Sequence, residues 1–321
     1  EIGVEKIEDI IGQTQYLEKM QSLDKQYQSI DLSDLIYKDS SLDESFFCTS
    51  KKNNPWDKGL LAKKILKEAK ESIDNEISTS LDFKISNTDR SIGGSISGYV
   101  AKKYGEPGLI NPINLNFTGS AGQSFGCWNA NGIQLTVDGD ANDYVGKGMN
   151  GGRIVIKNET PLLASNKETV LVGNTCLYGA TGGELYVSGR AGERFAVRNS
   201  GASAVIEGSG DHCCEYMTGG QVTVLGSVGA NFGAGMTGGF AYVLDEDKSF
   251  FDKCNRGLVN LERIHTEEMQ SHRKHLKETI AEHYRQTKSI KAKELIEDFD
   301  RFEPYFWLVV PAASNLSLIH I

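Results

Sequence analysis

The amino-acid sequence predicts an all-β solenoid: a single-stranded parallel β-helix of about seven coils, with flanking α-helical segments at both ends. Two observations lead to this prediction. Of the 35 glycines, 31 lie between Ser91 and Asp245. Within that region a glycine recurs at steps of 18 or 19 residues, with one longer step of 31. A period of this length with one short strand per repeat is typical of stacked coils.

The repeating glycines mark the corners of the predicted coils. They are Gly132, Gly151, Gly182, Gly201, Gly219 and Gly238. Glycine suits a corner because it adopts positive φ without steric cost and lets neighbouring backbones approach closely. The one longer step contains the polar residues 158–167, which we interpret as a loop inserted into the repeat.

Each repeating glycine is followed by a short strand whose alternate residues are apolar. Laid over one another with the preceding strand, these strands give two columns of apolar residues: Leu115, Leu135, Ile154, Leu185, Ala204, Val222 and Ala241 in the first, and Phe117, Val137, Ile156, Val187, Ile206, Val224 and Val243 in the second. Residues two apart in a strand share a face, so both columns are expected to point into the core. The residues between them, such as Thr223, are expected to face outward to solvent.

Composition divides the chain into a polar flanking segment (1–86), the glycine repeat (87–245) and a C-terminal helical tail (246–321). In the first segment, apolar residues at helical spacing over residues 60–73, shortly after Asn54-Pro55, predict a helix. The tail again shows helical periodicity. The open ends of a β-helix need covering, and we expect both flanking segments to cap them.

Composition and charge exclude several classes of protein. The chain has 34 lysines and arginines against 43 aspartates and glutamates, a net charge of −9, which argues against binding to nucleic-acid phosphates. No apolar stretch is long enough to span a membrane. Six cysteines in 321 residues are too few for a disulfide scaffold, so a cytoplasmic protein is expected. Because the sequence begins at Glu1 without a methionine, we expect a piece of a longer polypeptide.

Three Gly-x-Gly patterns invite comparison with nucleotide-binding loops. They begin at Gly146, Gly208 and Gly233. A dinucleotide fingerprint requires a helix after its glycines, whereas further strands are expected after these. A P-loop requires Ser or Thr after Gly-Lys, but Lys147 is followed by Gly148. We interpret all three as turn glycines of the repeat and predict no cofactor-binding residues.

No catalytic set and no metal site are predicted. Cys213 and Cys214 are adjacent, and without Cys-x-x-Cys spacing they are expected to be buried or turn thiols. His272 and His275 are expected on a helix, where they either belong to a solvated polar face or bind a metal. No carboxylate pair, Ser-His-Asp set or Cys-His set stands at a spacing that indicates catalysis.

The densest group of charges lies in one turn and comprises Glu193, Arg194 and Arg198, followed by Asn199. In one interpretation the charges close a corner inside the domain through hydrogen bonds to carbonyls of a neighbouring coil. In another the turn contacts a second domain, because three charges are a costly choice for a corner that only has to turn. A bidentate arginine would anchor such a contact well. A catalytic role is a third interpretation.

Several stretches resemble the C-terminal glycine-repeat (GXGXG) domain of the bacterial-type glutamate synthase large subunit. They are NTDRSIGGSISG at residues 87–98, TGSAGQSF at 118–125, GDANDYVGKGMNGG at 139–152, GNTCLYGATGG at 173–183, AGERFAVRNSG at 191–201, EYMTGG at 215–220 and NFGAGMTGGFAYVL at 231–244. The resemblance covers roughly residues 47–311, whereas residues 314–321 do not resemble the polar tail of the family.

The resemblance implies a right-handed β-helix that is a structural, non-catalytic partner of catalytic domains. The implied enzyme makes two glutamates from glutamine, 2-oxoglutarate and two reducing equivalents. Its cofactors are FMN and an iron–sulfur cluster, with NADPH oxidised through the small subunit, and none of these is expected to bind this chain. The amidotransferase and FMN-binding synthase domains are expected in the same polypeptide. The alternatives are a formylmethanofuran dehydrogenase-type subunit that shares the repeat and a stand-alone glycine-repeat interaction module.

Overall fold

The computed structural model describes residues 2–19, 31–39, 41, 59–158 and 169–312. The chain forms two compact units, Glu1–Trp56 and Asp57–Ile321. The described elements of the first unit are short: η1 (Ile7–Ile10), η2 (Thr14–Tyr16) and α2 (Ser33–Ile36). Both predicted segment boundaries, at 86/87 and 245/246, fall inside the second unit, and they stay predictions.

The second unit is built on a twelve-stranded sheet. The strands are β1 (Thr79–Ile85), β2 (Ile113–Ala121), β3 (Ile133–Ala141), β4 (Asn150–Lys157), β5 (Val170–Val172), β6 (Gly182–Val187), β7 (Arg190–Ala191), β8 (Ser200–Ile206), β9 (Thr218–Val224), β10 (Gly238–Leu244), β11 (Val259–Arg263) and β12 (Phe306–Pro311). The helices are α3 (Leu60–Asp74), α4 (Gly94–Tyr104), α6 (Phe250–Lys253), η3 (Glu267–Met269), α7 (Gln270–Thr287), α8 (Ile290–Glu297), α9 (Phe299–Phe302) and η4 (Glu303–Tyr305). Within the described ranges, no helix is long and apolar enough to cross a membrane.

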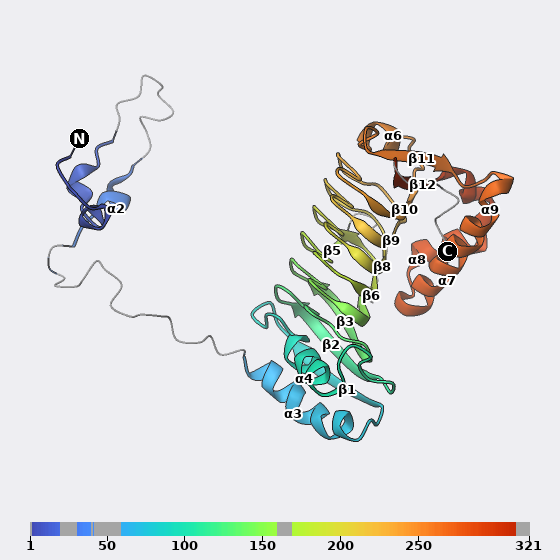
Figure 1. Cartoon of the computed structure of the whole chain (residues 1–321), viewed down its shortest axis with the longest axis horizontal. Helices are drawn as coiled ribbons and strands as arrows, with labels where there is room; N and C mark the ends of the chain where they lie inside the picture. The colour runs from blue at the N-terminus through green and yellow to red at the C-terminus, as the bar shows by residue number, and fades with distance from the viewer. Residues whose placement is uncertain (1, 20–30, 40, 42–58, 159–168, 313–321) are drawn as a thin grey trace. The chain divides into compact units, whose positions relative to one another are not determined.

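The prediction of an all-β solenoid, a single-stranded right-handed parallel β-helix, is wrong. The strands form one open sheet in the order β1-β2-β3-β4-β6-β8-β9-β10-β12-β11, with β5 and β7 off this path (Figure 1). Neighbours pair in parallel from β1 to β10, and only the pairs of β12 with β10 and β11 are antiparallel. The periodic glycines and the apolar columns require parallel strands in register, and an open sheet meets that requirement without closed coils.

The two apolar columns are confirmed as rows of paired residues across the sheet. Leu115 pairs with Leu135, which pairs with Ile154, and Phe117 pairs in the same way with Val137. All fourteen residues of the columns are at most 2% exposed. Complete burial of one such aliphatic side chain stabilises the fold by about 1.5–3 kcal/mol relative to exposure, so these rows are the main source of stability in the sheet.

The opposite face of the sheet is covered by the C-terminal helices. Val155 and Tyr186 belong to the same buried cluster as Leu276 and Ile280 of α7, and α7 contacts β4, β6 and β8. The prediction that residues between the columns face solvent is therefore wrong here, since Thr223 is 0% exposed. The C-terminal segment was expected to cap one end of the predicted β-helix. Instead, the apolar stripe of its helices is long enough to cover one face of the sheet.

The N-terminal helices lie at the other edge of the sheet. The predicted helix over residues 60–73 is confirmed by α3, whose Ile65, Ala69 and Ile73 are buried, while Asn54-Pro55 lies outside the described residues. Helix α3 contacts α4, β1 and β2. This places α3, from the predicted flanking segment, at the edge strand β1, with α4 packed against α3. Helix α4 itself lies within the segment predicted to be glycine repeat.

Across the core from the sheet runs a stack of six turns, here called the turn ladder: residues 124–128, 144–148, 175–179, 194–198, 212–216 and 231–235. In each turn the first, third and fifth residues have φ between 54° and 71°. Only six of these eighteen residues are glycine. A left-handed conformation costs a non-glycine residue about 1–2 kcal/mol, so twelve positions carry this cost.

Hydrogen bonds between successive turns offset that cost. The third residue of a turn donates its N–H to the preceding turn, as from Ala196 to the Cys176 carbonyl at 2.9 Å. The first and fifth residues donate to the following turn, as from Arg194 to Asp211 at 2.8 Å and from Arg198 to Glu215 at 2.9 Å. Buried backbone groups must be paired, and the alternating conformation pairs them in both directions along the ladder.

The six predicted corner glycines lie where neighbouring segments touch. An added Cβ at any of them would come within 2.6 Å of an atom of the preceding segment. At Gly201, for instance, it would lie 2.1 Å from the carbonyl oxygen of Thr181. Among the six, only Gly132 also has positive φ, at +84°. Close approach of backbones therefore explains these glycines better than the shape of the corner.

Candidate interdomain site

The charged turn singled out in the sequence is the fourth turn of the ladder. Arg194 and Arg198 occupy its first and fifth positions, with φ of 58° and 55°. The corner is closed by their backbone N–H groups, which donate to Asp211 and Glu215. The guanidinium groups are therefore not needed for the turn to form, and each side chain has to be considered by itself.

Arg194 forms an ion pair with the neighbouring turn. Its Nη2 lies 2.9 Å from Oε2 of Glu215, whose side chain is only 13% exposed. His212 approaches the other carboxylate oxygen, with 3.7 Å between Nδ1 and Oε1. The ion pair joins two successive turns, so Arg194 mainly serves the ladder itself.

Arg198 and Glu193 are exposed like Arg194, but they lack its ion pair. Among the described residues, neither side chain makes a hydrogen bond or an ion pair. An exposed guanidinium without a partner retains its five donors, which makes Arg198 the member of this group best placed to contact another surface.

Asn199 has an internal role. It is 0% exposed, its Nδ2 donates to the Ala202 carbonyl at 2.8 Å, and its Oδ1 accepts from the N–H of Ala202 at 3.0 Å. Both ends of the amide are thus used in the turn that leads into β8. Of the four residues in the predicted contact, Glu193, Arg194 and Arg198 are at the surface and Asn199 is not.

The ladder resembles an anion-binding nest, but its donors are already used. The N–H of Gly146 donates to Phe125 and that of Gly148 donates to Tyr178, each at 2.9 Å. A phosphate would have to displace both bonds, so the pattern that begins at Gly146 does not fit the phosphate of FMN. Gly146, Gly148, Gly233 and Gly235 lie in turns of the ladder, as expected of turn glycines, whereas Gly208 lies outside it.

The described cysteines do not fit an iron–sulfur cluster. All five are buried, and burial raises the pKa of the Cys176 and Cys254 thiols to about 12. Cluster ligands are thiolates grouped around the irons, whereas the only sulfur pair that interacts here is Cys213 with Cys214, at 3.9 Å. The expectation that Cys213 and Cys214 are buried thiols is confirmed.

The histidines of α7 serve the interior. His272 and His275 approach the hydroxyl of Tyr242 with Nδ1 at 2.8 Å and 3.2 Å. Burial lowers the pKa of both imidazoles. A solvated face was one expectation for this helix, and it is wrong for His272, which is 5% exposed. In the described part of the chain, no three His, Cys, Asp or Glu side chains are grouped as metal ligands.

Comparison with known proteins decides the family. Residues 60–312 match the family described as "GXGXG motif". The chain belongs to the GXGXG family. Similar proteins include ferredoxin-dependent glutamate synthase of Pyropia yezoensis, 45% identical over 98% of this chain and 20% of the relative. The chloroplastic ferredoxin-dependent enzyme of Spinacia oleracea is 43% identical over 98% of the chain and 19% of the relative. A third, ferredoxin-dependent glutamate synthase 2 of Synechocystis sp., is 46% identical over 77% and 16%.

The GXGXG domain of glutamate synthase, inferred from the resemblance, is thereby confirmed. The chain spans about a fifth of the length of the curated relatives it matches. Their names specify ferredoxin, so the narrower assignment to the bacterial-type enzyme with NADPH is not among these findings. In the turn ladder, the residues in the left-handed conformation stand two positions apart, as Gly146 and Gly148 do. The glycines in the family's name, GXGXG, have the same spacing.

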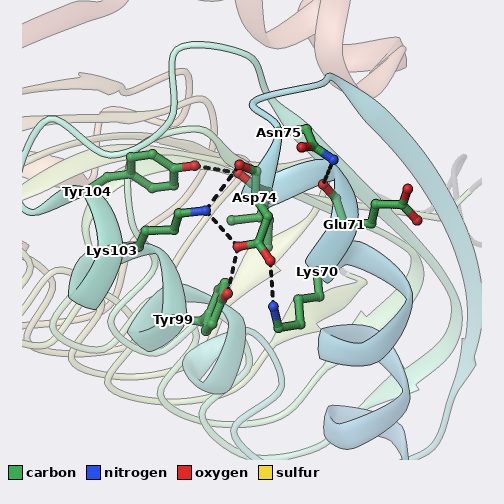
Figure 2. Close-up of polar contacts among 8 residues, drawn as sticks. Lys70, Glu71, Asp74, Asn75, Tyr99, Lys103 and Tyr104 are labelled. Carbon is green, nitrogen blue, oxygen red and sulfur yellow. Dashed lines mark hydrogen bonds and ion pairs between the residues drawn. The ribbon is translucent and has the colours of Figure 1, made fainter.

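The match to the GXGXG family begins at residue 60 and so includes α3, which carries a polar cluster that the sequence analysis missed. Figure 2 shows Asp74 at the end of α3 receiving donors from both helices. Lys103 Nζ and the Tyr99 hydroxyl of α4 each lie 2.7 Å from Oδ1, and Lys70 binds Oδ2. The Lys103 ammonium, then Lys70 and Tyr99, hold the pKa of Asp74 well below its usual range.

This Asp74 cluster joins α3 to α4 and has a structural role. Tyr104 adds a bond from its hydroxyl to the carbonyl of Ile73 (Figure 2). The partners are 25 to 31 residues apart in the chain, so no local pattern links them. An i, i+4 pair of Lys70 with Asp74 was the one part visible in the sequence.

Proposed function

We propose that this chain is the non-catalytic GXGXG domain of a glutamate synthase, the enzyme that makes two glutamates from glutamine, 2-oxoglutarate and two reducing equivalents. The observation that carries the proposal is the 45% identity over 98% of the chain to a ferredoxin-dependent glutamate synthase of which it spans one fifth. The similarity therefore extends over nearly the whole chain and is not confined to the glycine repeat. Nothing in the chain favours a formylmethanofuran dehydrogenase-type subunit or a stand-alone module.

The non-catalytic role is supported by how the reactive side chains are used. The described thiols are all buried, and burial raises the pKa of Cys127, Cys176 and Cys254, which leaves little nucleophilic thiolate at these three near neutral pH. The imidazoles of His272 and His275 are bound to Tyr242. Glutaminase and synthase chemistry would thus take place in the amidotransferase and FMN-binding domains, with FMN and the iron–sulfur cluster held there.

For the electron donor we propose ferredoxin, because the similar proteins named above are all ferredoxin-dependent. NADPH acting through a small subunit, which the resemblance implied, is the competing donor. The two enzymes would share this domain, so the domain itself does not distinguish them. A cytoplasmic location likewise stays a prediction from the sequence.

The test uses the intact polypeptide that contains this chain. Reduced ferredoxin with glutamine and 2-oxoglutarate is expected to support glutamate formation, and the control without glutamine is expected to lose it. Turnover with NADPH and a copurifying small subunit would replace ferredoxin as the donor. A reading frame without amidotransferase and FMN-domain sequence upstream would overturn the proposal and favour a separate module.

A further inference from the structure

The outer surface of the turn ladder carries a row of aromatic and cationic side chains, here called the ladder stripe: Trp128, Tyr144, Lys147, Tyr178, Arg198 and Tyr216. Trp128 is 63% exposed and Tyr216 is 50% exposed. Arg198 is exposed and the other three are partly exposed. Tryptophan, tyrosine and arginine are the residue types that dominate the centres of protein interfaces.

The ladder bonds hold these residues next to one another. Trp128 donates its N–H to the Lys147 carbonyl at 2.8 Å, and Gly148 donates to Tyr178 at 2.9 Å. The ammonium of Lys147 lies 5.2 Å from the ring centre of Tyr144 and 5.9 Å from that of Tyr178. The stripe extends over five turns in register with strands about 4.8 Å apart, which gives it a length of about 19 Å, a large part of one side of a standard protein interface.

Glycines allow the two most exposed rings to lie flat along the ladder. A Cβ at Gly148 would come 2.9 Å from the indole of Trp128, and a Cβ at Gly235 would come 2.3 Å from the ring of Tyr216. Each ring therefore rests on the glycine of the next turn and leaves its other face open. Rings held in this way lose little further conformational entropy on binding, which favours association.

We propose that the ladder stripe is the surface on which this domain docks against the remainder of the same polypeptide. The inference rests on the proposed function and adds the site and the chemistry of the partner. The docked surface is apolar where it meets Trp128 and Tyr216, and acidic where it meets Lys147 and Arg198.

Length and charge support this occupant. Four-fifths of each similar protein lies outside the part that this chain matches, so a tethered partner is present at high effective concentration. The chain carries a net charge of −9, and the stripe places the cationic Lys147 and Arg198 on this surface, with the exposed Glu193 beside the turn of Arg198. Lys147 and Arg198 suit a partner that is acidic where it meets them, whereas two copies of the stripe would bring like charges together.

The test measures docking directly in the intact polypeptide. A protease site inserted between Trp56 and Asp57, where the two units divide, allows the chain to be cut after folding, and the dissociation constant of the two pieces is then measured. Trp128→Ala and Arg198→Glu are each expected to weaken the complex about tenfold or more, the effect of losing a central interface residue. Hydroxyl-radical footprinting of the uncut wild type is expected to show Trp128 and Tyr216 protected.

Matched controls lie away from the stripe. Lys274→Glu reverses a charge that is 79% exposed on α7, and Ile110→Ala removes an apolar side chain that is 87% exposed. Both are expected to leave the dissociation constant unchanged, and thermal melting checks that every variant folds. Should the stripe variants behave like the controls, or Trp128 oxidise as fast as exposed Tyr305, docking on the stripe is refuted.

Two further outcomes are informative. Protection that disappears on dilution of the uncut protein would assign the stripe to a second copy and overturn the proposed occupant. Glutamate formation with reduced ferredoxin is measured on the same uncut sample. An active enzyme with an unprotected stripe contradicts the docking proposal alone, whereas a protected stripe without glutamate formation contradicts the proposed function alone.

Discussion

At the scale of single residues, the turn ladder shows that backbone conformation and side-chain role are separate matters. Arg194 and Arg198 share a left-handed conformation, equivalent backbone bonds and exposure to solvent, yet only Arg194 is paired with Glu215. Their proximity in the sequence suggested one shared purpose. The structure divides them because the Glu215 carboxylate lies within reach of Arg194, whereas the Arg198 side chain has no partner among the described residues.

Replacing Arg198 by glycine distinguishes the cost of its left-handed backbone from any contribution of its side chain to stability. At φ of 55° glycine pays no steric cost, and the exposed side chain that is lost has no described partner. The free energy of unfolding of the chain is therefore expected to stay the same or rise by up to about 1 kcal/mol. Urea denaturation measures this change.

Arg198→Val is the matched control for that variant. A β-branched residue is poorly suited to the left-handed region, so unfolding should become easier by about 1–2 kcal/mol. If Arg198→Gly instead destabilised the chain by as much as valine does, the guanidinium would be an internal staple of the corner.

At the scale of elements, α7 and the other C-terminal helices bury the second face of the later strands. The outward positions of the strands include Val155, Tyr186, Val205 and Tyr242, and all four are buried beneath the C-terminal helices. Their apolar character was present in the sequence as a third, weaker column. It was overlooked because Thr136 and Thr223 interrupt it, and a threonine in a strand is as common on a solvated face as on a covered one.

Because α7 covers Thr223, a charged side chain at this position is expected to destabilise the fold. Thr223→Asp buries a carboxylate at a position that is 0% exposed, so it is expected to destabilise the chain by several kcal/mol, roughly 2–4. Thr136→Asp is the matched control, because Thr136 occupies the equivalent row position on β3 and is partly exposed. It should cost less than about 1 kcal/mol. Equal melting temperatures of the two variants would contradict the placement of α7.

Acidification tests the contact between α7 and β10. The pKa values of His272 and His275 are lowered by burial, so the folded state holds neutral imidazoles while the unfolded chain takes up protons below pH about 6.5. Stability is therefore present above that pH and is lost as the pH falls through it, by at most about 1.4 kcal/mol per pH unit for each imidazole.

The measurement is the unfolding free energy of the wild type and of the double variant His272→Gln with His275→Gln, between pH 8 and pH 5. The double variant keeps side chains able to bind the Tyr242 hydroxyl but has no group there that titrates. It should show a shallower decline on acidification. Parallel curves for the two proteins would mean that other groups govern the acid sensitivity.

At the scale of the whole molecule, the second unit is a sheet with one face lined by the turn ladder and the other partly covered by helices (Figure 1). Each surface has its own cluster of buried residues. The inner cluster extends along the whole row of parallel strands, and the outer one is formed where α7 and α8 meet the later strands. At the end of the ladder, α6 adjoins the last turn, where the N–H of Phe232 donates to the Lys253 carbonyl at 3.0 Å.

The purified chain is expected to show no flavin absorbance and no glutamate formation. The donors of the ladder are occupied and the described thiols are buried, so FMN and an iron–sulfur cluster have no suitable ligands among them. Absorption spectra and assays with reduced ferredoxin, glutamine and 2-oxoglutarate check this. A yellow protein, or one that forms glutamate alone, would contradict the placement of the chemistry in other domains.

The sequence by itself determined the parallel register, because two columns of buried residues repeat at a period that only aligned strands satisfy. It also identified the glycines at close backbone contacts, the helix α3 and the GXGXG family. Only the tertiary structure decided that the sheet stays open, that α7 covers the face carrying Thr223, and that Asp74 joins two helices. These features depend on contacts between residues far apart in the chain, such as the hydrogen bond from Gln221 to Thr279. A contact of this kind produces no periodic pattern in either of the two segments that it joins. Local patterns record which face of a strand is apolar, whereas the element that covers it is selected by the packing of the whole chain.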